Sequence, residues 1–298
     1  MSRTPQSPHG RVVVGFDGSA HAERALDRAA EEARRRGAAL EILAGWPWPK
    51  RPLPDYGVQD DEGKLLYSSV RRMMDGAVAR ARSRAPDTIM IPSLTTESAA
   101  EALLRCGRTA SLTVLGTRGH GGFTGLLLGS VSLRVAAHCT SPLMVVRGDL
   151  QPVHGTVVLG LATDTDTDTK ALRFAFDEAA RREAELRVLY AWQLPPPHGE
   201  LGRLSHPSGG AVAGLRKAAE AVPQYAVASL AREYPGLRAS ALAVCRSPAQ
   251  AITEASREAD VVILAAHRRP HRFGLQLGPV THAALHHAHC PVVLVPTG

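Results

Sequence analysis

Residues Gly116–Ser132 read GTRGHGGFTGLLLGSVS, with glycines at 116, 119 and 129 followed by the hydroxyls of Ser130 and Ser132. An apolar run, LTVLG, leads into this stretch, and an alanine-rich run, VSLRVAAHC, overlaps its end. A strand, a glycine-rich loop and a helix in this order are typical of a phosphate-binding loop. Glycines let the backbone approach a ligand, and a new helix offers unpaired N–H groups. The alternative is a tight strand–helix turn without a ligand.

The spacing of these glycines differs from two common nucleotide motifs. The dinucleotide fingerprint packs its glycines into six residues, and the P-loop needs Gly-Lys before Ser or Thr. Here the pattern is G-x-x-G, nine residues, then Gly-Ser.

The chain contains an internal repeat: two copies of one sequence unit follow each other. The segment that starts at Arg11 matches the one that starts at Thr156, and Ser98–Gly116 matches Ser247–Ala265. A length of 298 residues also favours two domains of about 150 residues each. We therefore expect domains at 1–149 and 150–298.

Apolar runs alternate with helical patterns in each copy, which predicts an α/β fold with a parallel sheet covered on both faces. In the first copy the expected strands are Val12–Phe16, Leu40–Gly45, Thr88–Thr95, Leu112–Gly116 and Leu143–Val146. The expected helices are His21–Arg36, Leu66–Arg84, Ala99–Arg108 and Ser130–His138. Surface loops are expected at Pro47–Glu62 and Leu194–Gly210, which are rich in proline and glycine.

Four motifs of the first copy resemble the universal stress protein family: GFDGS at Gly15–Ser19, AGWPWP at Ala44–Pro49, the long loop, and SPLMVV from Ser141. The whole chain is similar to the tandem two-domain members common in actinobacteria. The resemblance implies two Rossmann-like (adenine nucleotide alpha hydrolase-like) domains with five-stranded parallel sheets. It also implies ATP at the carboxyl ends of the strands and pairing of the domains through their last strands.

The resemblance assigns a role to each motif residue of the first copy. Asp17 would lie near the ribose or a metal ion such as Mg²⁺, although it also reads as a turn residue before the N-cap Ser19. Backbone groups of Ala44 and Gly45 would meet the adenine. The phosphates would contact the following set: Gly116, Gly119, Gly129, Ser130, Val131 and Ser132. Arg118 and His120 read mainly as exposed loop residues, with a contact to the phosphates as the alternative.

The second copy departs from this pattern, so its motif is degenerate. Asp17 aligns with Ala162, and of the aligned glycines only Gly129 is kept, as Gly278. The remaining replacements are Gly116 by Ala265, Gly119 by Arg268 and Ser130 by Pro279. Proline removes an N–H donor, whereas an arginine can itself bind phosphate. Asp164, Asp166 and Asp168 read mainly as helix N-terminal charges, with a substitute for Asp17 or a metal site as the alternative.

Composition and charge limit the other functions. The net charge is +7, but the basic residues are spread along helices and aromatic residues are only 4%, so nucleic-acid binding is not expected. No run approaches the roughly 18 apolar residues of a membrane span, and we expect a cytoplasmic protein. The four cysteines read as small buried residues. His282, His286, His287 and His289 read as a polar helix surface, with metal binding as the alternative.

The favoured function is an ATP-binding regulatory protein, expected to form a homodimer and to act on an unknown protein partner. The rivals are a slow ATP-hydrolysing enzyme and a scaffold that binds no nucleotide. We do not expect a dedicated enzyme, because the sequence offers no P-loop lysine and no evident general base.

Overall fold

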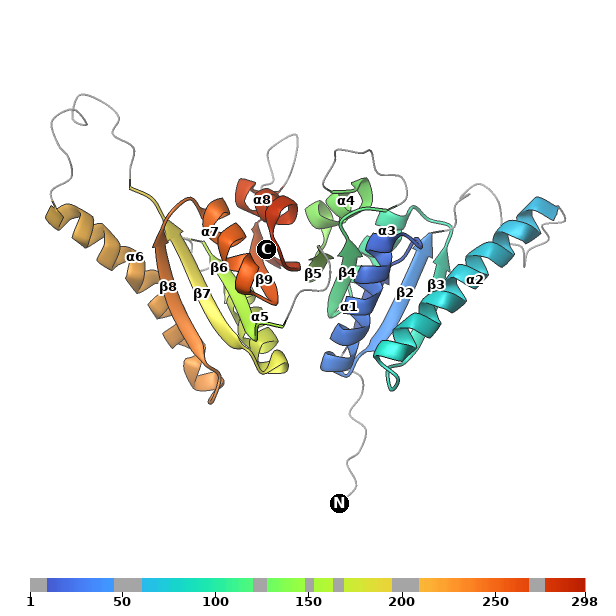
Figure 1. The fold of residues 1–298 in the computed structure, drawn as a ribbon, viewed down its shortest axis with the longest axis horizontal. Coiled ribbons are helices and arrows are strands. Elements are labelled where there is room, and N and C mark those ends of the chain that lie inside the picture. Colours follow the sequence, from blue (N-terminus) through green and yellow to red (C-terminus); the bar gives the residue numbers. More distant parts are fainter. Residues whose placement is uncertain are drawn as a thin grey trace, which may run out of the picture. The chain divides into compact units, whose positions relative to one another are not determined.

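The computed structural model describes residues 10–45, 61–119, 128–147, 153–162, 169–194, 209–267 and 277–297. The chain divides into two compact units, Met1–Leu150 and Gln151–Gly298. Each unit is an α/β domain with a parallel sheet and helices on both faces (Figure 1). The predicted fold class is confirmed.

The first unit contains five strands within its described residues: β1 (Arg11–Gly15), β2 (Ala39–Gly45), β3 (Met90–Thr95), β4 (Leu112–Gly116) and β5 (Leu143–Val146). Its helices are α1 (Ala20–Arg36), α2 (Asp61–Arg84), α3 (Ala99–Gly107) and α4 (Ser130–His138). These bounds agree closely with the expected ones. The helix α2 begins at Asp61, so the last two residues of the expected loop Pro47–Glu62 are helical; the rest of that loop lies outside the described residues.

The strand order of this sheet is β3-β2-β1-β4-β5, and every pairing is parallel. From β1 the chain builds β2 and β3 on one side and then crosses to β4 and β5 on the other. The order therefore reverses between β1 and β4. In open α/β sheets such a switch point leaves a crevice at the carboxyl ends of the two strands, where ligands bind.

Local sequence signals set the ends of α1. Ser19 is its N-cap, and the Ser19 hydroxyl accepts a hydrogen bond from the Ala22 backbone N–H over 3.2 Å. Gly37 ends the helix in the left-handed conformation, with φ of 59°, which glycine adopts without steric cost. Between these ends, buried alanines and Leu26 recur at helical spacing and pack on β1 and β4.

Helices α1 and α2 cover one face of the sheet, and α3 and α4 lie on the other (Figure 1). The carboxylate of Asp27, 3% exposed on α1, anchors α2. It accepts hydrogen bonds from Arg80 Nε at 2.7 Å and Arg80 Nη2 at 2.9 Å, and it also pairs with Arg84. This bidentate pairing of Arg80 with Asp27 fixes the packing of α2 on α1.

The second unit repeats the architecture with strand order β8-β7-β6-β9-β10, again parallel throughout. Its strands are β6 (Thr156–Leu161), β7 (Glu185–Trp192), β8 (Ala239–Cys245), β9 (Val261–His267) and β10 (Val292–Thr297). Its helices are α5 (Thr169–Arg182), α6 (Gly209–Leu230), η3 (Ala231–Glu233), α7 (Pro248–Ala255), η4 (Ser256–Glu258) and α8 (Pro279–His287). The expected loop Leu194–Gly210 ends inside α6, and residues 195–208 lie outside the described part.

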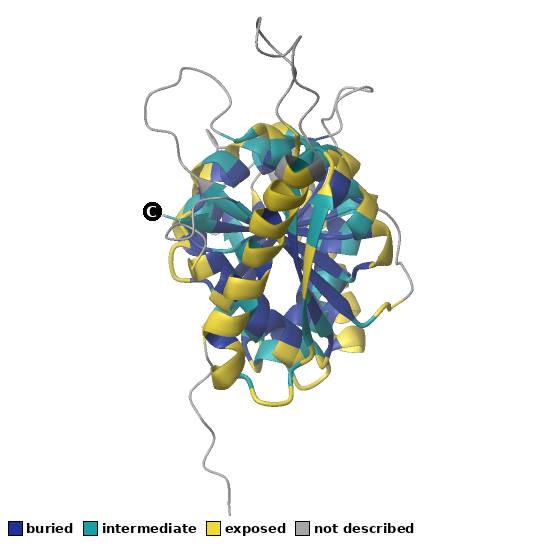
Figure 2. Cartoon of the chain, turned by 90° about the vertical axis from the view of Figure 1, so that its left-hand side faces the viewer, coloured by how far each residue is buried: buried dark blue, intermediate teal, exposed yellow. Residues whose placement is uncertain are grey.

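The strands form the core, and the helices turn their polar faces to solvent (Figure 2). Three cysteines are buried as expected: Cys106, Cys139 and Cys290. The expectation is wrong for Cys245, which is exposed because it ends the edge strand β8. Among the described helices, none combines the length and the apolar character that crossing a bilayer requires.

Candidate functional site

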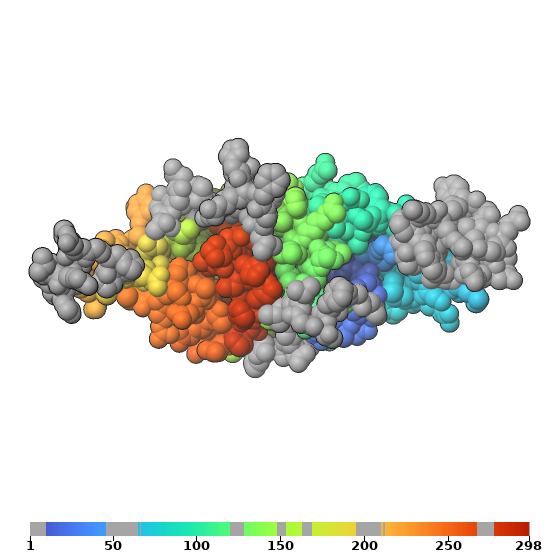
Figure 3. Space-filling view, turned by 90° about the horizontal axis from the view of Figure 1, so that it is seen from above, coloured from blue at the N-terminus to red at the C-terminus, as the bar shows by residue number. Residues whose placement is uncertain are grey.

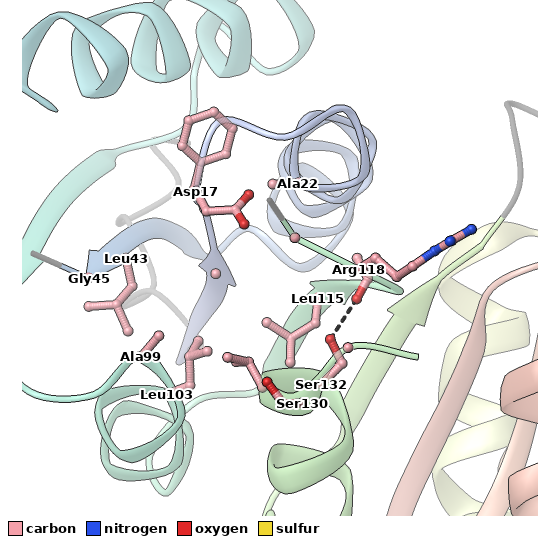
Figure 4. Close-up of a pocket in the computed structure, with 16 residues that line it drawn as sticks. Asp17, Ala22, Leu43, Gly45, Ala99, Leu103, Leu115, Arg118, Ser130 and Ser132 are labelled. Atoms are coloured by element: carbon pink, nitrogen blue, oxygen red, sulfur yellow. Dashed lines mark hydrogen bonds between the residues drawn. The ribbon is translucent and has the colours of Figure 1, made fainter. Parts of the chain in front are cut away.

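A cavity of about 360 Å³ lies where the carboxyl ends of β1 and β4 meet the start of α4 (Figure 4). Eight of the nine predicted site residues line it: Asp17, Gly45, Gly116, Gly119, Gly129, Ser130, Val131 and Ser132. Apolar side chains of Leu43, Leu103 and Leu115 form its inner wall. The cavity therefore combines an apolar wall with polar groups on one side, as small-molecule sites commonly do.

The carboxylate of Asp17 has two roles in this geometry. Its Oδ1 accepts a hydrogen bond from the Ser19 backbone N–H at 3.0 Å, which is the predicted turn role. Its Oδ2 lies against Gly119, where a Cβ atom would approach that oxygen to 2.2 Å. The absence of a side chain at Gly119 thus lets the carboxylate and the loop share one edge of the cavity.

Gly116, the last residue of β4, is required for a different reason. A Cβ atom there would meet the backbone carbonyl oxygen of His21 at 2.6 Å. Backbone atoms of a helix do not move aside as the end of a flexible side chain does. The close approach of β4 to the start of α1 therefore depends on glycine at this position.

The start of α4 presents free donors at the cavity. Gly129 is the N-cap, and its own N–H is used in a 2.7 Å bond to the Thr117 carbonyl. The next three N–H groups, of Ser130, Val131 and Ser132, have no intrahelical acceptor because they occupy the first turn. In the described part of the chain, no side chain caps this helix. The positive end of the helix dipole thus faces the cavity with donors available for an anion.

The two serine hydroxyls of α4 differ in what they offer. Ser132 is buried, and its hydroxyl donates a 2.8 Å hydrogen bond to the Gly116 carbonyl (Figure 4). This bond ties α4 to the end of β4 and uses the hydroxyl proton, so of the two donors predicted for Ser132 only the backbone N–H faces a ligand. Ser130 is exposed, and no hydrogen bond to its hydroxyl occurs among the described residues.

Ala44 is the ninth predicted residue, and the structure does not bring it to the cavity lining. It is 1% exposed, whereas its neighbours Leu43 and Gly45 line the cavity. Successive residues of a strand face opposite sides, which places 43 and 45 on one side and 44 on the other. A contact from the Ala44 backbone to a base remains a prediction.

Two further residues outside the expected set affect the site, and His21 packs against Gly116 and Thr117 without lining the cavity. The His21 Nδ1 atom lies 2.9 Å from Arg24 Nη2 and 3.1 Å from Thr117 Oγ1. Because a guanidinium can only donate, Nδ1 must accept, and the ring proton sits on Nε2. Burial lowers the pKa of His21, the cations Arg24 and Arg118 lower it further, and the Asp17 carboxylate opposes them. The net lowering favours the neutral ring.

Arg118 is half-buried rather than exposed as expected. Its backbone lines the cavity, and its guanidinium points away from Asp17 and Ser130 (Figure 4). The Nε atom is buried and has no hydrogen-bond partner among the described residues. His120 lies outside those residues.

The corresponding positions of the second unit lack these features where the structure describes them. Gly278 caps α8 with φ of −64° and ψ of 158°, close to the −73° and 157° of Gly129 before α4. Pro279 then occupies the position of Ser130 and has no N–H to offer. Ala265 carries a Cβ where Gly116 has none. Arg268 and the three aspartates at 164, 166 and 168 lie outside the described residues.

The histidines of α8 do not assemble a recognisable metal site. The rings of His282 and His286 stack with centroids 4.1 Å apart, as expected for residues four apart on a helix. Within the described residues, no group of three or more His, Cys, Asp or Glu side chains is arranged to hold a metal ion.

Comparison with known proteins gives a consistent result. A profile described as the universal stress protein family matches residues 9–147 and 156–296. A universal stress protein of Mycobacterium tuberculosis H37Rv is 29% identical over 97% of this chain and 98% of its own length. A universal stress protein of Mycolicibacterium smegmatis is 25% identical over 95% of this chain and 96% of its own. The crystal structure of a universal stress protein from Archaeoglobus fulgidus superposes with a TM-score of 0.63 at 14% identity, covering 96% of this chain and 98% of that one.

Proposed function

The chain belongs to the universal stress protein family over both of its halves, and on this basis we propose that its first domain binds ATP for a regulatory purpose. Occupancy of the site would set the conformation of the protein or its choice of protein partner. This role gives the cavity of the first domain a ligand that matches its groups: phosphates for the helix N-terminus and the flat ring face of adenine for the leucine wall.

The observation that carries the proposal is the set of N–H groups at the start of α4. Three successive donors, from Ser130 to Ser132, face a cavity that the glycines keep open. Hydrogen bonds from such donors to an ionised group contribute about 1.5–3 kcal/mol each. The dipole of α4 adds to this attraction for an anion.

The remaining parts of the ligand follow from this placement. Asp17 stands across the cavity from the helix, where the family resemblance puts the ribose or a metal ion. A single carboxylate suits Mg²⁺, which commonly takes one or two protein carboxylates and completes its coordination with phosphate oxygens and water. The adenine would lie along the ends of β1 and β2, against Leu43 and Gly45.

We extend the proposal to the division of labour between the domains. Pro279 removes a donor, Ala162 removes the carboxylate, and Ala265 introduces a side chain where the first domain has none. Each change weakens a site built on charge-assisted hydrogen bonds. The chain would then bind about one nucleotide, in the first domain.

The same cavity favours binding over catalysis. Hydrolysis needs a positioned water, a base and neutralisation of charge on the γ-phosphate. Among the described lining residues Asp17 is the only carboxylate, and its Oδ1 already accepts a hydrogen bond. We therefore propose that turnover is slow, far below the ~10 per second typical of enzymes.

Identifying the nucleotide that purifies with the protein tests the proposal against its rivals. Protein purified without added nucleotide is denatured, and the released small molecules are identified by mass spectrometry. ATP in near-stoichiometric amount supports the regulatory binder, whereas ADP with phosphate release on incubation supports the enzyme. An empty protein that also fails to bind added ATP supports the scaffold. The expected homodimer and cytoplasmic location draw on the family resemblance, and sedimentation of the purified chain tests the first of these.

A further inference from the structure

The second unit contains an open recess of about 780 Å³ between α7 and α8. Helices α7 and α8 pack side by side, and they meet as the orange and red surfaces in Figure 3. Four basic side chains line the recess: Arg246, Arg257, His287 and His289. Glu254 is the one acidic residue among the described lining residues.

The first unit closes the equivalent position with an ion pair. There, Arg134 of α4 reaches Glu101 of α3 with 3.3 Å between Nη2 and Oε1. In the second unit Gln250 stands in place of Glu101, and Ala283 stands in place of Arg134. Both Gln250 and Ala283 line the recess. The loss of this bridge removes the long side chain that spans the two helices and leaves the recess open.

A second pair at this position has exchanged its charges. Glu97 accepts from Arg105 at 3.0 Å in the first unit, whereas in the second unit Arg246 pairs with Glu254. The exchange places the paired side chains of Arg246 and Glu254 in the lining of the recess. Because the two charges are paired, together they add little net charge to the recess.

The cations that remain are available to a ligand. Arg257 of η4 has no hydrogen-bond or ion-pair partner in the described part of the chain. His289 follows α8, and its backbone N–H is held by Ser256 Oγ at 2.9 Å, which positions it beside η4. His289 takes the place of Thr140 of the first unit, so this imidazole is an addition of the second copy.

We propose that this recess binds a small multivalent oxyanion, a phosphorylated or polycarboxylate compound. The fork of the Arg257 guanidinium matches a phosphate or carboxylate group, and the imidazoles of His287 and His289 can donate ring N–H hydrogen bonds to the same anion. The site is separate from the ATP cavity of the first domain, and it stands whether or not that cavity binds ATP.

The test uses the full chain with inorganic pyrophosphate and, in a second arm, citrate. NMR spectra of the histidine rings, assigned through His287→Gln and His289→Gln, report the recess directly. We expect saturable shifts of both rings, with His138 of the first unit as the unaffected reference. Binding of pyrophosphate alone identifies a phosphate ligand, and binding of both identifies a general polycarboxylate and phosphate site.

Variants separate a built site from general attraction to a basic surface. Arg257→Ala should weaken pyrophosphate binding by about tenfold, as expected for the loss of a charge-assisted hydrogen bond. The matched control is Arg232→Ala, an equal loss of charge in the other 3-10 helix, η3, of the same unit. The double variant Gln250→Glu with Ala283→Arg copies the first unit's bridge and should abolish binding. Absence of ring shifts with both probes, or equal losses in Arg257→Ala and Arg232→Ala, would overturn the proposal.

Discussion

At the scale of single residues, Asp17 and Gly119 lie together at one edge of the first domain's cavity. The carboxylate occupies the volume that a side chain at 119 would need. It also holds the turn before α1 through Ser19. One contact therefore links the start of α1 to the glycine-rich loop, although the two lie about a hundred residues apart in sequence.

We predict that Gly119→Leu reduces ATP affinity by about a hundredfold or more, because the new side chain displaces Asp17 or the loop. Calorimetric titration measures the affinity, and circular dichroism checks the fold. Gly76→Leu is the matched control, since a Cβ at Gly76, within α2, meets no atom within 4 Å. Unchanged ATP affinity in Gly119→Leu would show that the ligand does not use this edge.

A second prediction at this scale concerns His21. Its folded-state pKa lies below the ordinary 6.5, so the unfolded chain binds the proton more readily than the folded one. The stability contributed by the neutral ring is complete above pH 6.5 and is lost as the pH falls below that value. The free energy of unfolding of the wild type should therefore fall relative to His21→Gln between pH 7.5 and pH 5.5. Parallel pH profiles for the two proteins, measured by urea denaturation, would refute this role.

From sequence, the positions of residues could be predicted where a residue type has a local meaning. The spaced glycines and the carboxylate that follows β1 are such residues, and they lie together at the cavity. His21 was not predicted, because its partner Thr117 is 96 residues away and comes near only in the folded sheet. The internal bond of the Ser132 hydroxyl and the inward burial of Ala44 likewise depend on how β4 and β2 pack.

At the scale of elements, the first turn of α4 is the part of the fold that we propose to bind the phosphates. Its N-cap conformation is nearly the same as that of α8, even though α8 begins with proline. Proline at the first helical position has a suitable φ and costs the helix nothing but an N–H donor. The second domain thus demonstrates a backbone-compatible way to remove one donor.

Ser130→Pro should therefore lower ATP affinity by about tenfold or more while leaving stability within about 0.5 kcal/mol, since one charge-assisted hydrogen bond is lost. Ser130→Ala keeps the N–H and removes only the hydroxyl, so a smaller loss is expected. Titration and thermal unfolding of both variants give the comparison. A larger loss in the alanine variant would assign the contact to the hydroxyl instead.

The docking of α2 on α1 gives a second prediction for elements. Asp27→Ala leaves Arg80 and Arg84 without their shared buried partner. Because the arginines are partly exposed, we expect a loss of about 1–3 kcal/mol of stability. Urea denaturation measures it, and Glu101→Ala, which breaks an exposed pair, should cost less than about 1 kcal/mol. Equal costs for the two variants would contradict the anchoring role of Asp27.

The positions of the helices and strands were predicted well because the sequence signals for both are strong. The buried strands are continuous apolar runs, and α1 combines an N-cap serine with a C-terminal glycine. The third strand was placed two residues early, since Thr88 belongs to a turn in which its N–H bonds to the Ala85 carbonyl at 3.1 Å. The start of helix α2 at Asp61 was missed because Asp61–Lys64 is polar and carries no apolar stripe that would mark it as helical.

At the scale of the whole molecule, the two domains share one fold but differ in the groups that they place at the start of α4 and α8. The first domain keeps the glycines, the carboxylate and the free N–H groups at the start of α4. The second domain keeps the fold but replaces these groups, and it opens a basic recess between α7 and α8 instead. Duplication followed by divergence of a few residues accounts for both differences, because the strands and helices that support them are shared.

Calorimetric titration of the nucleotide-free full chain with ATP tests the central claim most directly. The account predicts about one site per chain, and it predicts that Gly119→Leu in the first domain removes that site. Two sites of similar affinity would contradict the claim, because the second domain would then bind without the groups proposed to be essential. Binding that survives in Gly119→Leu and Ser130→Pro alike would contradict it as well, since the nucleotide would lie outside the cavity of the first domain.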